Sequence, residues 1–459
     1  MNYDFDVAVI GGGSGGYAAA RTAAASGLRT VLFEGAEEIG GLCILHGCMP
    51  TKALLYAAER LHVVRDSKLW GIESKHVHLD FAKTMARKNS LIQNFADYRR
   101  EALVNAKFKF LRARAQFLDP HTVELSTGEK ITAAHFVIST GSIVAPPPLP
   151  QLADVGYLTS DDALRLIELP KSLIILGGGA IACEFAQLFT RFGSKVTLLQ
   201  RSAHVLNEFD ADAGETIEKV FRQEGVDVFT ETKLTDARRA GDVRSVVFEH
   251  EGKTVTVSAE QILFALGRKS NITGLGLDAA GVKTENGRIK ANEFMQTSAP
   301  HIYAAGDCTG PHDIVHIAVQ QGEAAGLNIA KPRTRKMDSR LHLVVVFTEP
   351  QVAQVGLNEK QAQAQNIPYI TASYPFNDHG KSMIMEANDG FVKLLADPKT
   401  GEIIGGACVG PAGGELIHEI VLAMASRMTV QEFMLIPHYH PTLAEIWTYP
   451  AEELAEKIL

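Results

Sequence analysis

The chain opens on a short apolar run, Asp6–Ile10, and reaches a second one at Thr30–Phe33. Apolar runs of this length between turn residues predict strands that are buried on both faces of a parallel sheet. Between them, the alanine-rich segment Tyr17–Ala25 predicts a helix, and a run of glycines separates it from the first strand. The pattern therefore predicts a strand, a glycine loop, a helix and a second strand.

The same succession returns in the middle of the chain. Ser172–Leu176 and Lys195–Leu199 are apolar runs, and the helical pattern Cys183–Phe192 lies between them after a second glycine cluster. Further short strands are expected at Phe136–Thr140, Gln261–Ala265 and His301–Ala305. We therefore expect an α/β fold with two Rossmann-like dinucleotide-binding domains.

The last quarter of the chain has a different pattern. The proline-rich segment 146–150 and the basic segment 331–340 are expected to be linkers. After the second linker, strand patterns mix with one helical pattern, at Leu341–Phe347, Gly390–Ala396, Glu402–Val409 and Glu415–Ala425. This mixture predicts a C-terminal α+β domain.

Composition narrows the classes of protein that fit these elements. The 459 residues are 46% hydrophobic and 21% charged, with a net charge of −8, so a large basic surface for nucleic acid is not expected. No apolar run is long enough for a membrane span, and the acidic N-terminus lacks the features of a signal peptide, so a cytoplasmic location is expected. Five cysteines are too few for a secreted disulfide framework.

The first glycine loop has the spacing GxGxxG at Gly11, Gly13 and Gly16, and Glu34 follows the second strand. In a strand–loop–helix context, these glycines permit a tight turn, close approach to a pyrophosphate and close helix packing, while the acid binds a ribose. The second loop repeats the spacing at Gly177 and Gly179. Two such loops imply two dinucleotides, and the alternative is that one of them is a degenerate copy left by duplication.

Cys43 and Cys48 are the only cysteines close together in the sequence, and a helical pattern follows them. A thiol at a helix start is favoured as a thiolate, so we interpret the pair as redox-active. A zinc site needs about four ligands and no second cysteine pair is present, so we expect no metal; an inert buried pair is the other alternative.

Near the C-terminus, His440 stands five residues before Glu445. A thiol–disulfide catalyst needs a base of histidine's proton affinity, and a carboxylate can orient the ring. With His438, however, the histidine could equally belong to a metal-binding fragment or to a solvated loop.

Taken together, the segments Gly11–Gly16, Gly40–Lys52, Gly177–Glu184, Ala304–Asp307 and His440–Glu445 resemble the class I FAD-dependent pyridine nucleotide–disulfide oxidoreductases over nearly the whole chain. The resemblance implies a flavoprotein whose FAD-binding domain comprises residues 1–147 and 268–335. It further implies an NAD(P)-binding domain at 148–267 and a C-terminal dimerisation domain at 336–459.

The resemblance also implies roles for single residues. Cys48 would be the charge-transfer thiol beside the flavin, Cys43 the interchange thiol, and Lys52 with Glu184 an ion pair near the flavin, for which a plain ion pair is the alternative. In a homodimer, His440 and Glu445 would serve the partner subunit's disulfide. FAD would be held by Gly11, Gly13, Ser14, Gly16, Glu34, Gly41, Lys52, Thr140, Gly141, Gly306, Asp307 and Ala318; NAD(H) or NADP(H) would be held by Gly177, Gly179, Ala180, Ile181, Gln200, Arg201 and Gly267.

Within the family, the pattern is closest to dihydrolipoyl dehydrogenase, with features like those of mercuric reductase. A lipoyl-bearing carrier protein is then the expected partner, and reduction of another disulfide, a metal ion or a quinone, or redox sensing, stays an alternative. Gln200 stands where NAD-preferring members place an acid, and Arg201 could contact a 2′-phosphate, so the coenzyme stays open. His46 could lower a thiol pKa by its charge or be a solvated loop residue.

Overall fold

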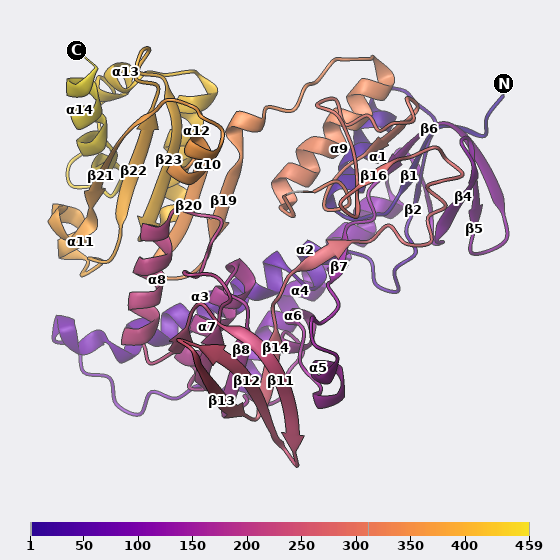
Figure 1. The fold of residues 1–459 in the computed structure, drawn as a ribbon. Helices are drawn as coiled ribbons and strands as arrows, with labels where there is room; N and C mark the ends of the chain where they lie inside the picture. Colours follow the sequence, from indigo (N-terminus) through magenta and orange to yellow (C-terminus); the bar gives the residue numbers. More distant parts are fainter. Residues whose placement is uncertain (1, 311, 459) are drawn as a thin grey trace. The chain divides into compact units, whose positions relative to one another are not determined.

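The computed structural model describes residues 2–310 and 312–458, in two compact units (Figure 1). Unit 1 comprises Met1–Ala53, Ala82–Pro146 and Gly267–Met337; unit 2 comprises Leu54–Phe81, Pro147–Leu266 and Asp338–Leu459. The expected limits at residues 1 and 459 lie outside the described residues. The four-segment division into domains stays a prediction.

Unit 1 is built on a seven-stranded sheet in which β1 pairs in parallel with β2 and with β6. The strands are β1 (Phe5–Ile10), β2 (Thr30–Phe33), β3 (Lys109–Leu111), β4 (Ala115–Asp119), β5 (Thr122–Leu125), β6 (Lys130–Ile138) and β18 (Ile302–Ala304). β18 also joins β6 in parallel, so a segment far along the chain completes the sheet. Two small ladders pair β7 (Ser142–Val144) with β15 (Arg268–Ser270), and β16 (Thr284–Glu285) with β17 (Arg288–Ile289).

The helices of unit 1 are α1 (Ser14–Ala25), α2 (Gly41–Leu45), α4 (Phe81–Val104) and α9 (Val315–Ala330). α3 (Cys48–Arg65) begins in unit 1, and its residues from Leu54 onward belong to unit 2. α1 and α9 lie side by side over the sheet, as Figure 1 shows. The predicted helix at residues 17–25 is therefore confirmed, and it begins three residues earlier, inside the glycine loop.

Unit 2 contains the second predicted dinucleotide-binding unit. Its parallel sheet has the order β10 (Asp227–Phe229), β9 (Lys195–Leu199), β8 (Ser172–Leu176) and β14 (Gln261–Phe264). An antiparallel sheet follows, of β11 (Lys233–Ala240), β12 (Val243–His250) and β13 (Lys253–Ala259). The helices are α5 (Pro150–Val155), α6 (Ser160–Ala163), α7 (Ala180–Phe192) and α8 (Ala211–Gln223), with the short helix η1 (Ser67–Trp70).

The C-terminal part of unit 2 is the expected α+β arrangement. An antiparallel sheet has the order β19 (Leu343–Val346), β20 (Gln351–Gly356), β23 (Ile403–Gly410), β22 (Phe391–Ala396) and β21 (Ile370–Pro375). The helices are α10 (Glu359–Ala364), α11 (Gly380–Ile384), α12 (Gly413–Ala425), α13 (Val430–Met434) and α14 (Thr448–Lys457), with the short helices η2 (Ser339–Leu341), η3 (Phe376–Asp378) and η4 (Ala444–Trp447). The mixed α/β class predicted from the sequence is thus confirmed.

Two local expectations were inaccurate. The strand expected at residues 301–305 ends at Ala304, because the chain turns at Gly306, whose φ is +80°. The sequence around Cys308 predicts a strand or helix context, but Cys308 lies in the turn after Gly306 and is fully buried.

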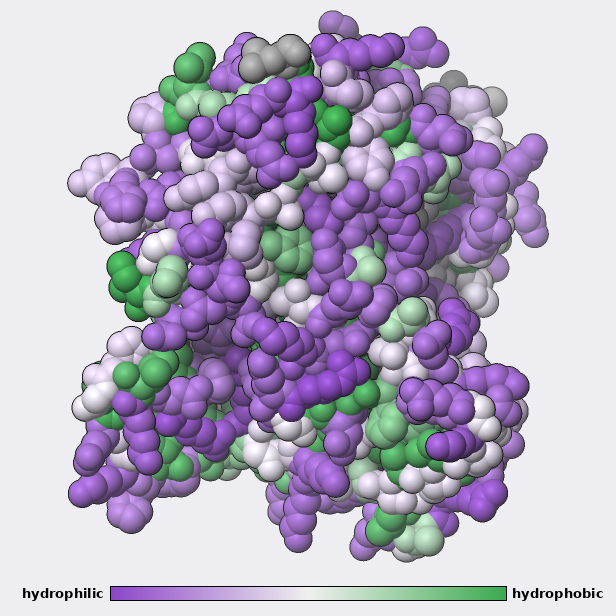
Figure 2. Space-filling model, turned by 60° about the vertical axis from the view of Figure 1, so that its left-hand side comes forward, coloured by the Kyte–Doolittle hydropathy of each residue, from purple (hydrophilic) through white to green (hydrophobic). Residues whose placement is uncertain are grey.

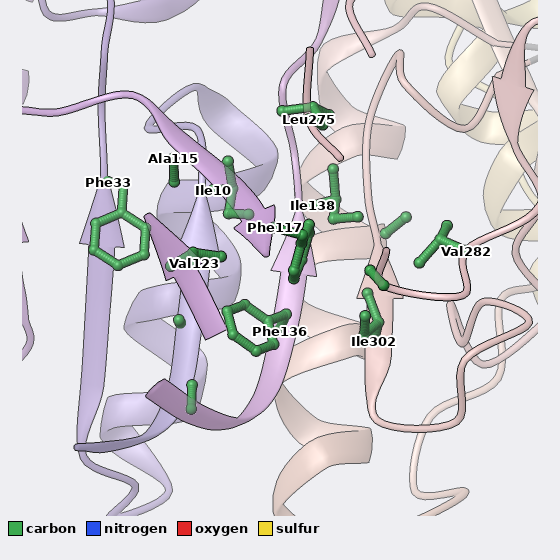
Figure 3. Close-up of a cluster of buried hydrophobic side chains, with 14 of the residues drawn as sticks. Ile10, Phe33, Ala115, Phe117, Val123, Phe136, Ile138, Leu275, Val282 and Ile302 are labelled. Carbon is green, nitrogen blue, oxygen red and sulfur yellow. The ribbon is translucent and has the colours of Figure 1, made fainter. Parts of the chain in front are cut away.

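A large cluster of buried apolar side chains lies against one face of the unit 1 sheet (Figure 3), and a second cluster packs α1 and α9 on the alternate residues of its strands. Phe117 and Phe136 meet edge to face, with ring centroids 4.9 Å apart, and Phe33 belongs to the same cluster. Because Phe136 is fully buried, its side chain contributes apolar burial and aromatic packing together.

The surface of the molecule is mainly polar on the face drawn in Figure 2, where hydrophobic residues form only small scattered groups. Among the described helices, none is both long and apolar enough to cross a membrane.

Replacing Phe136 by alanine should lower the free energy of unfolding of unit 1 by about 3–5 kcal/mol, because the substitution leaves a cavity in a close-packed core. The shift in the midpoint of urea unfolding, followed by circular dichroism, measures this loss. Leu118→Ala on β4 is the matched control, since that side chain is 41% exposed and its loss should cost within about 0.5 kcal/mol. Equal shifts for the two variants would contradict this view of the core.

Candidate active site

The first glycine loop connects β1 to α1 with the backbone packed at contact distance. Gly11 has φ +102°, and a Cβ there would lie 2.3 Å from the carbonyl oxygen of Ser139. A Cβ on Gly16 would lie 1.9 Å from the carbonyl oxygen of Gly11. Gly13 caps α1 without a side-chain hydrogen bond, and a Cβ there would meet nothing within 4 Å. Gly11 and Gly16 thus serve the fold, whereas Gly13 leaves open space at the helix N-terminus, where Ser14 begins the helix.

Glu34 is held against this loop by two backbone donors. The N–H of Gly12 donates to its Oε2 at 2.9 Å, and the N–H of Ala36 donates to its Oε1 at 2.7 Å. A carboxylate has about four acceptor positions, so it keeps capacity for two ribose hydroxyls. The acid predicted from its place after β2 therefore lies at the glycine loop.

A second set of polar groups comes from the ends of β6 and β18. The hydroxyl of Ser142 donates to Asp307 Oδ2 at 2.7 Å, and Arg268 Nε donates to that hydroxyl oxygen at 2.9 Å. Ser142 and Arg268 thus orient the predicted site residue Asp307. Sequence reasoning did not assign a role to either, because their contacts join segments more than a hundred residues apart.

Thr140 is an unpaired polar group in this set. Its Oγ1 is buried and has no hydrogen-bond partner among the described residues. Gly141 beside it has φ +70°, and Asn271 N–H donates to the Gly141 carbonyl oxygen at 2.9 Å. A buried hydroxyl without a partner is rare in proteins and indicates a missing ligand. The orphaned hydroxyl, the open space at Gly13 and the oriented carboxylates of Glu34 and Asp307 fit FAD.

α9 brings Ala318 to the same loop, where Gly306, which follows β18, also lies. A Cβ on Gly15 would lie 3.0 Å from the carbonyl oxygen of Ala318, and one on Gly306 would lie 3.4 Å from Ala318 Cβ. A Cβ on Gly322 would lie 2.1 Å from the carbonyl oxygen of Gly15, so the two helices touch backbone to backbone. Sequence reasoning did not assign this packing role to Gly322, although a glycine inside a helical pattern was the available signal.

The two cysteines lie on consecutive helices of unit 1. Cys43 is in α2, and Cys48 is the first residue of α3. Gly41, at the start of α2, has φ +72°, and a Cβ there would lie 2.9 Å from Gly13 Cα. The cysteine segment is thus packed directly on the predicted FAD loop.

Both cysteines are half-buried and are present as thiols in the structure. A hydrogen bond with Cys48, and then burial, raises the pKa of the Cys43 thiol. Cys48 stands at the start of an 18-residue helix, and a helix N-terminus favours a thiolate.

Two further side chains lie close to the cysteines. His46 Nε2 is 3.5 Å from Glu38 Oε2, and its side chain is 23% exposed, so it is not a freely solvated loop residue. Arg99 on α4 stacks over the Tyr17 ring at 4.3 Å, and burial lowers the pKa of Arg99 against smaller opposing contributions from Tyr17 and Cys43. No motif pointed to Arg99.

The second glycine loop, in unit 2, repeats the geometry of the first. Gly177 has φ +114°, and a Cβ there would lie 2.4 Å from the carbonyl oxygen of Ala265. Gly179 caps α7 without a side-chain bond and has open space around it, and Ala180 and Ile181 after it are exposed. These positions fit a second dinucleotide phosphate at a helix N-terminus.

Gln200 follows β9 and folds over this loop. A Cβ on Gly178 would lie 2.8 Å from Gln200 Cδ, and the Gln200 amide accepts from Arg201 N–H at 2.9 Å and donates to the His204 carbonyl oxygen at 3.2 Å. The neutral amide thus occupies the position expected for a ribose-binding acid, with the exposed Arg201 next to it. Gly267, the other predicted residue, belongs to unit 1 and has φ +111°.

Lys52 and Glu184 lie in different units. Lys52 is half-buried on α3, and Glu184 is 4% exposed on α7. Glu184 Oε1 accepts the Phe347 N–H at 3.0 Å. The pairing of Lys52 with Glu184 stays a prediction.

His440 and Glu445 form a hydrogen-bonded pair in unit 2. His440 Nδ1 is 3.1 Å from Glu445 Oε1 and 3.0 Å from Oε2. The histidine side chain is 79% exposed and the glutamate 11%, so the carboxylate is held inside while the ring presents Nε2 outward. This is the arrangement of a general base oriented by a carboxylate.

His438 does not share these contacts. Its Nε2 is 2.8 Å from Glu419 Oε1, so the two histidines of the segment face different carboxylates. In the described part of the chain, no group of three or more His, Cys, Asp or Glu side chains could hold a metal ion.

Comparison with known proteins agrees with this geometry. The model of the pyridine nucleotide-disulphide oxidoreductase family matches residues 5–322, and that of its dimerisation domain matches residues 343–451. The chain is 35% identical to the dihydrolipoyl dehydrogenase of Bacillus subtilis, covering 97% of each chain. It is 33% identical to the mercuric reductase of Bacillus cereus, covering 97% of this chain and 70% of that protein. Among solved structures, LpdA from Mycobacterium tuberculosis superposes with a TM-score of 0.87 at 27% identity, covering 98% and 99% of the two chains.

Two alanine substitutions should separate folding from cofactor binding in the first loop. Gly16→Ala places a Cβ against a carbonyl oxygen and should destabilise unit 1 by about 1–3 kcal/mol. Gly13→Ala meets no protein atom, so it should leave the thermal midpoint of the flavin-free protein unchanged while weakening FAD binding. Thermal unfolding by circular dichroism and the flavin absorbance of the purified protein measure the two effects. Normal flavin content in Gly13→Ala would contradict the binding role.

The coenzyme preference should depend on Gln200. A glutamate there could accept hydrogen bonds from ribose hydroxyls and would repel a 2′-phosphate. Gln200→Glu should therefore raise the ratio of kcat/KM for NADH to that for NADPH by about tenfold or more. This size follows because a hydrogen bond to a charged group contributes about 1.5–3 kcal/mol. Ferricyanide reduction with either coenzyme measures the ratio without the physiological substrate. An unchanged ratio would remove Gln200 from the ribose site. Lys195→Gln, on the exposed start of β9, is the control.

Proposed function

The chain belongs to the pyridine nucleotide-disulphide oxidoreductase family, and from this premise we propose that it oxidises the dihydrolipoamide of a carrier protein with NAD+ or NADP+. It is a flavoprotein disulfide oxidoreductase whose cofactors are FAD and a nicotinamide dinucleotide. The dithiol substrate and the choice between NAD(H) and NADP(H) are parts of the proposal.

The observation that supports this function best is the His440–Glu445 pair. Oxidation of a dithiol requires a base that takes a proton from the attacking thiol. Because Glu445 accepts from Nδ1, the free Nε2 of His440 can take that proton at its exposed edge. A protein that only binds a flavin does not need such an oriented base.

The proposed reaction starts from the oxidised enzyme, in which Cys43 and Cys48 form a disulfide. One substrate thiol loses its proton to His440 and attacks the Cys43 sulfur; the S–S bond breaks, and Cys48 leaves as a thiolate. The second substrate thiol then attacks the sulfur bound to Cys43, which closes the cyclic disulfide of the product and releases Cys43. The substrate dithiol is oxidised, and the enzyme disulfide is reduced by the same two electrons.

Cys48 and Cys43 hold different protonation states after this step. On its release, Cys43 takes the proton held by His440, which then accepts the proton of the second substrate thiol. The raised pKa of Cys43 favours this transfer, and the start of α3 favours the thiolate of Cys48. FAD, when bound, carries the two electrons from the dithiol pair to the nicotinamide. We propose that Gly13, Glu34, Thr140 and Asp307 hold it, and that Lys52 pairs with Glu184 beside it.

His440 is proposed to act on the partner subunit's disulfide in a homodimer. The chain carries a dimerisation domain at residues 343–451. Large apolar side chains in that part are exposed, among them Leu422 at 67%, Leu435 at 84% and Tyr439 at 83%, which favours their burial against a second copy. A cytoplasmic location, where thiols stay reduced between turnovers, belongs to the same proposal.

Anaerobic oxidation of dihydrolipoamide by the purified yellow protein, with NAD+ and NADP+ in parallel, tests this function. Formation of NADH or NADPH, followed by absorbance at 340 nm, is the expected result. Cys43→Ser should reduce this turnover to background, because the sulfur under attack is missing, while FAD stays bound.

Cys408→Ala is the matched control, because Cys408 is a fully buried thiol on β23, and it should keep its turnover. Failure with both coenzymes, in protein with FAD and a reducible disulfide, would contradict dihydrolipoamide as substrate. Full turnover in Cys43→Ser would contradict the disulfide mechanism itself. NADH or NADPH oxidation with a quinone that persists in this variant would favour direct reduction of such acceptors by the flavin.

A further inference from the structure

A second histidine lies behind Glu445, on the side away from the exposed His440. His379 is fully buried between η3 and α11, and its Nε2 is 3.3 Å from Glu445 Oε1. The same carboxylate oxygen is 3.1 Å from His440 Nδ1. Glu445 therefore lies between two imidazoles, one exposed and one buried, although the sequence separates His379 from Glu445 by more than sixty residues.

The other ring nitrogen of His379 has its own partner. Nδ1 is 2.8 Å from the hydroxyl of Ser382, which is also fully buried. A serine hydroxyl can donate or accept, so it can give its proton to Nδ1 and leave the histidine proton on Nε2, facing the carboxylate. In the structure, Nε2 lies within ion-pair distance of Glu445 but is not aligned for a hydrogen bond. Nε2 has no hydrogen-bond partner among the described residues.

Among the groups that surround His379, Glu445 and His440 are the two whose charge acts on its pKa. Phe376 and Tyr449 approach the ring edge to face, with centroids 6.5 Å and 6.3 Å away. Tyr374 stacks on Tyr449, and burial with the nearby Asp378 raises the pKa of Tyr374 to about 12, so it stays protonated. Burial lowers the pKa of His379 more than Glu445 raises it. The ring is therefore already neutral at the pH where an ordinary histidine is half protonated.

We propose that His379 is a positioning residue for the His440–Glu445 pair, donating through Nε2 to Glu445 while Ser382 donates to Nδ1. This inference rests on the proposed function, because it assigns His379 to the base that acts on the dithiol. A neutral donor on Oε1 fixes the rotation of the carboxylate toward His440. It also takes up part of the carboxylate charge, so Glu445 holds the proton on His440 less strongly and the imidazole can release it to the Cys43 thiolate.

The pH dependence of kcat/KM for dihydrolipoamide tests this role. In His379→Phe, the ring volume is kept and the donor is lost, so the full charge of Glu445 should stabilise protonated His440. The midpoint of the acidic limb should then move up by about 0.5–1 pH unit. His379→Gln keeps an N–H donor near the Nε2 position and should return the midpoint to the wild-type value.

A double-mutant cycle separates positioning from a general structural effect. In a Glu445→Gln background, His379→Phe should leave the midpoint unchanged, because the carboxylate through which it acts is absent. A shift of equal size in that background, or no shift in His379→Phe alone, would overturn the proposal. His418→Gln is the control, since His418 faces the Gly414 carbonyl oxygen on α12, and its midpoint should match the wild type.

A second measurement does not depend on the substrate. Titration of 13C-labelled histidine by NMR, with His440 assigned from the His440→Gln variant, should show the same upward movement of the His440 midpoint in His379→Phe. Wild-type protein that does not oxidise dihydrolipoamide would contradict the proposed function, and the NMR midpoint would still decide the role of His379.

If His379→Phe does not fold, Ser382→Ala serves instead. It frees the proton of His379 to move to Nδ1, and it should raise the His440 midpoint by a smaller amount. An unchanged NMR midpoint in a folded variant would overturn the proposal.

Discussion

Unit 1 depends on the contact of backbone with backbone around the first glycine loop. A single Cβ at Gly16 would lie 1.9 Å from the Gly11 carbonyl oxygen, and one at Gly322 would lie 2.1 Å from that of Gly15. These contacts bring β1, α1 and α9 close enough that the start of α1 and the segment around Ala318 share one small region. The cysteine segment joins the same region through Gly41 against Gly13. The absence of side chains, rather than their presence, therefore places the redox pair next to the predicted flavin loop.

The site carboxylates of the two units share one feature, that neighbouring groups of the protein fix their direction. Glu34 accepts two backbone N–H groups, and Asp307 accepts the hydroxyl of Ser142. Glu445 is buried beside His440 and His379 in the same way. In each case the donors fix the direction of the carboxylate before any ligand or substrate arrives, which is the condition for a preorganised site. The buried hydroxyl of Thr140 has no hydrogen-bond partner among the described residues, and its place beside Asp307 and Gly141 makes it available to a cofactor.

The division of labour between the cysteines depends on their helices and on each other. Cys48 begins a long helix, whereas Cys43 lies in a helix of five residues and is hydrogen-bonded to Cys48. The chemistry that the family resemblance assigns to them, one thiol for exchange and one for charge transfer, is compatible with this difference. The other three cysteines, Cys183, Cys308 and Cys408, differ from this pair because they are fully buried. Burial raises the pKa of each thiol, so they stay protonated and inert.

The sequence by itself determined the two strand–loop–helix–strand units, both glycine loops, the cysteine pair and the partnership of His440 with Glu445. These features are local, since hydrophobic periodicity and spacing within a few residues carry them. Only the tertiary structure decided that Ser142 and Arg268 orient Asp307, that Gln200 folds over Gly178, and that His379 lies against Glu445. Such contacts join segments far apart in the chain, and they arise from how sheets and helices pack, so no periodicity in the sequence records them.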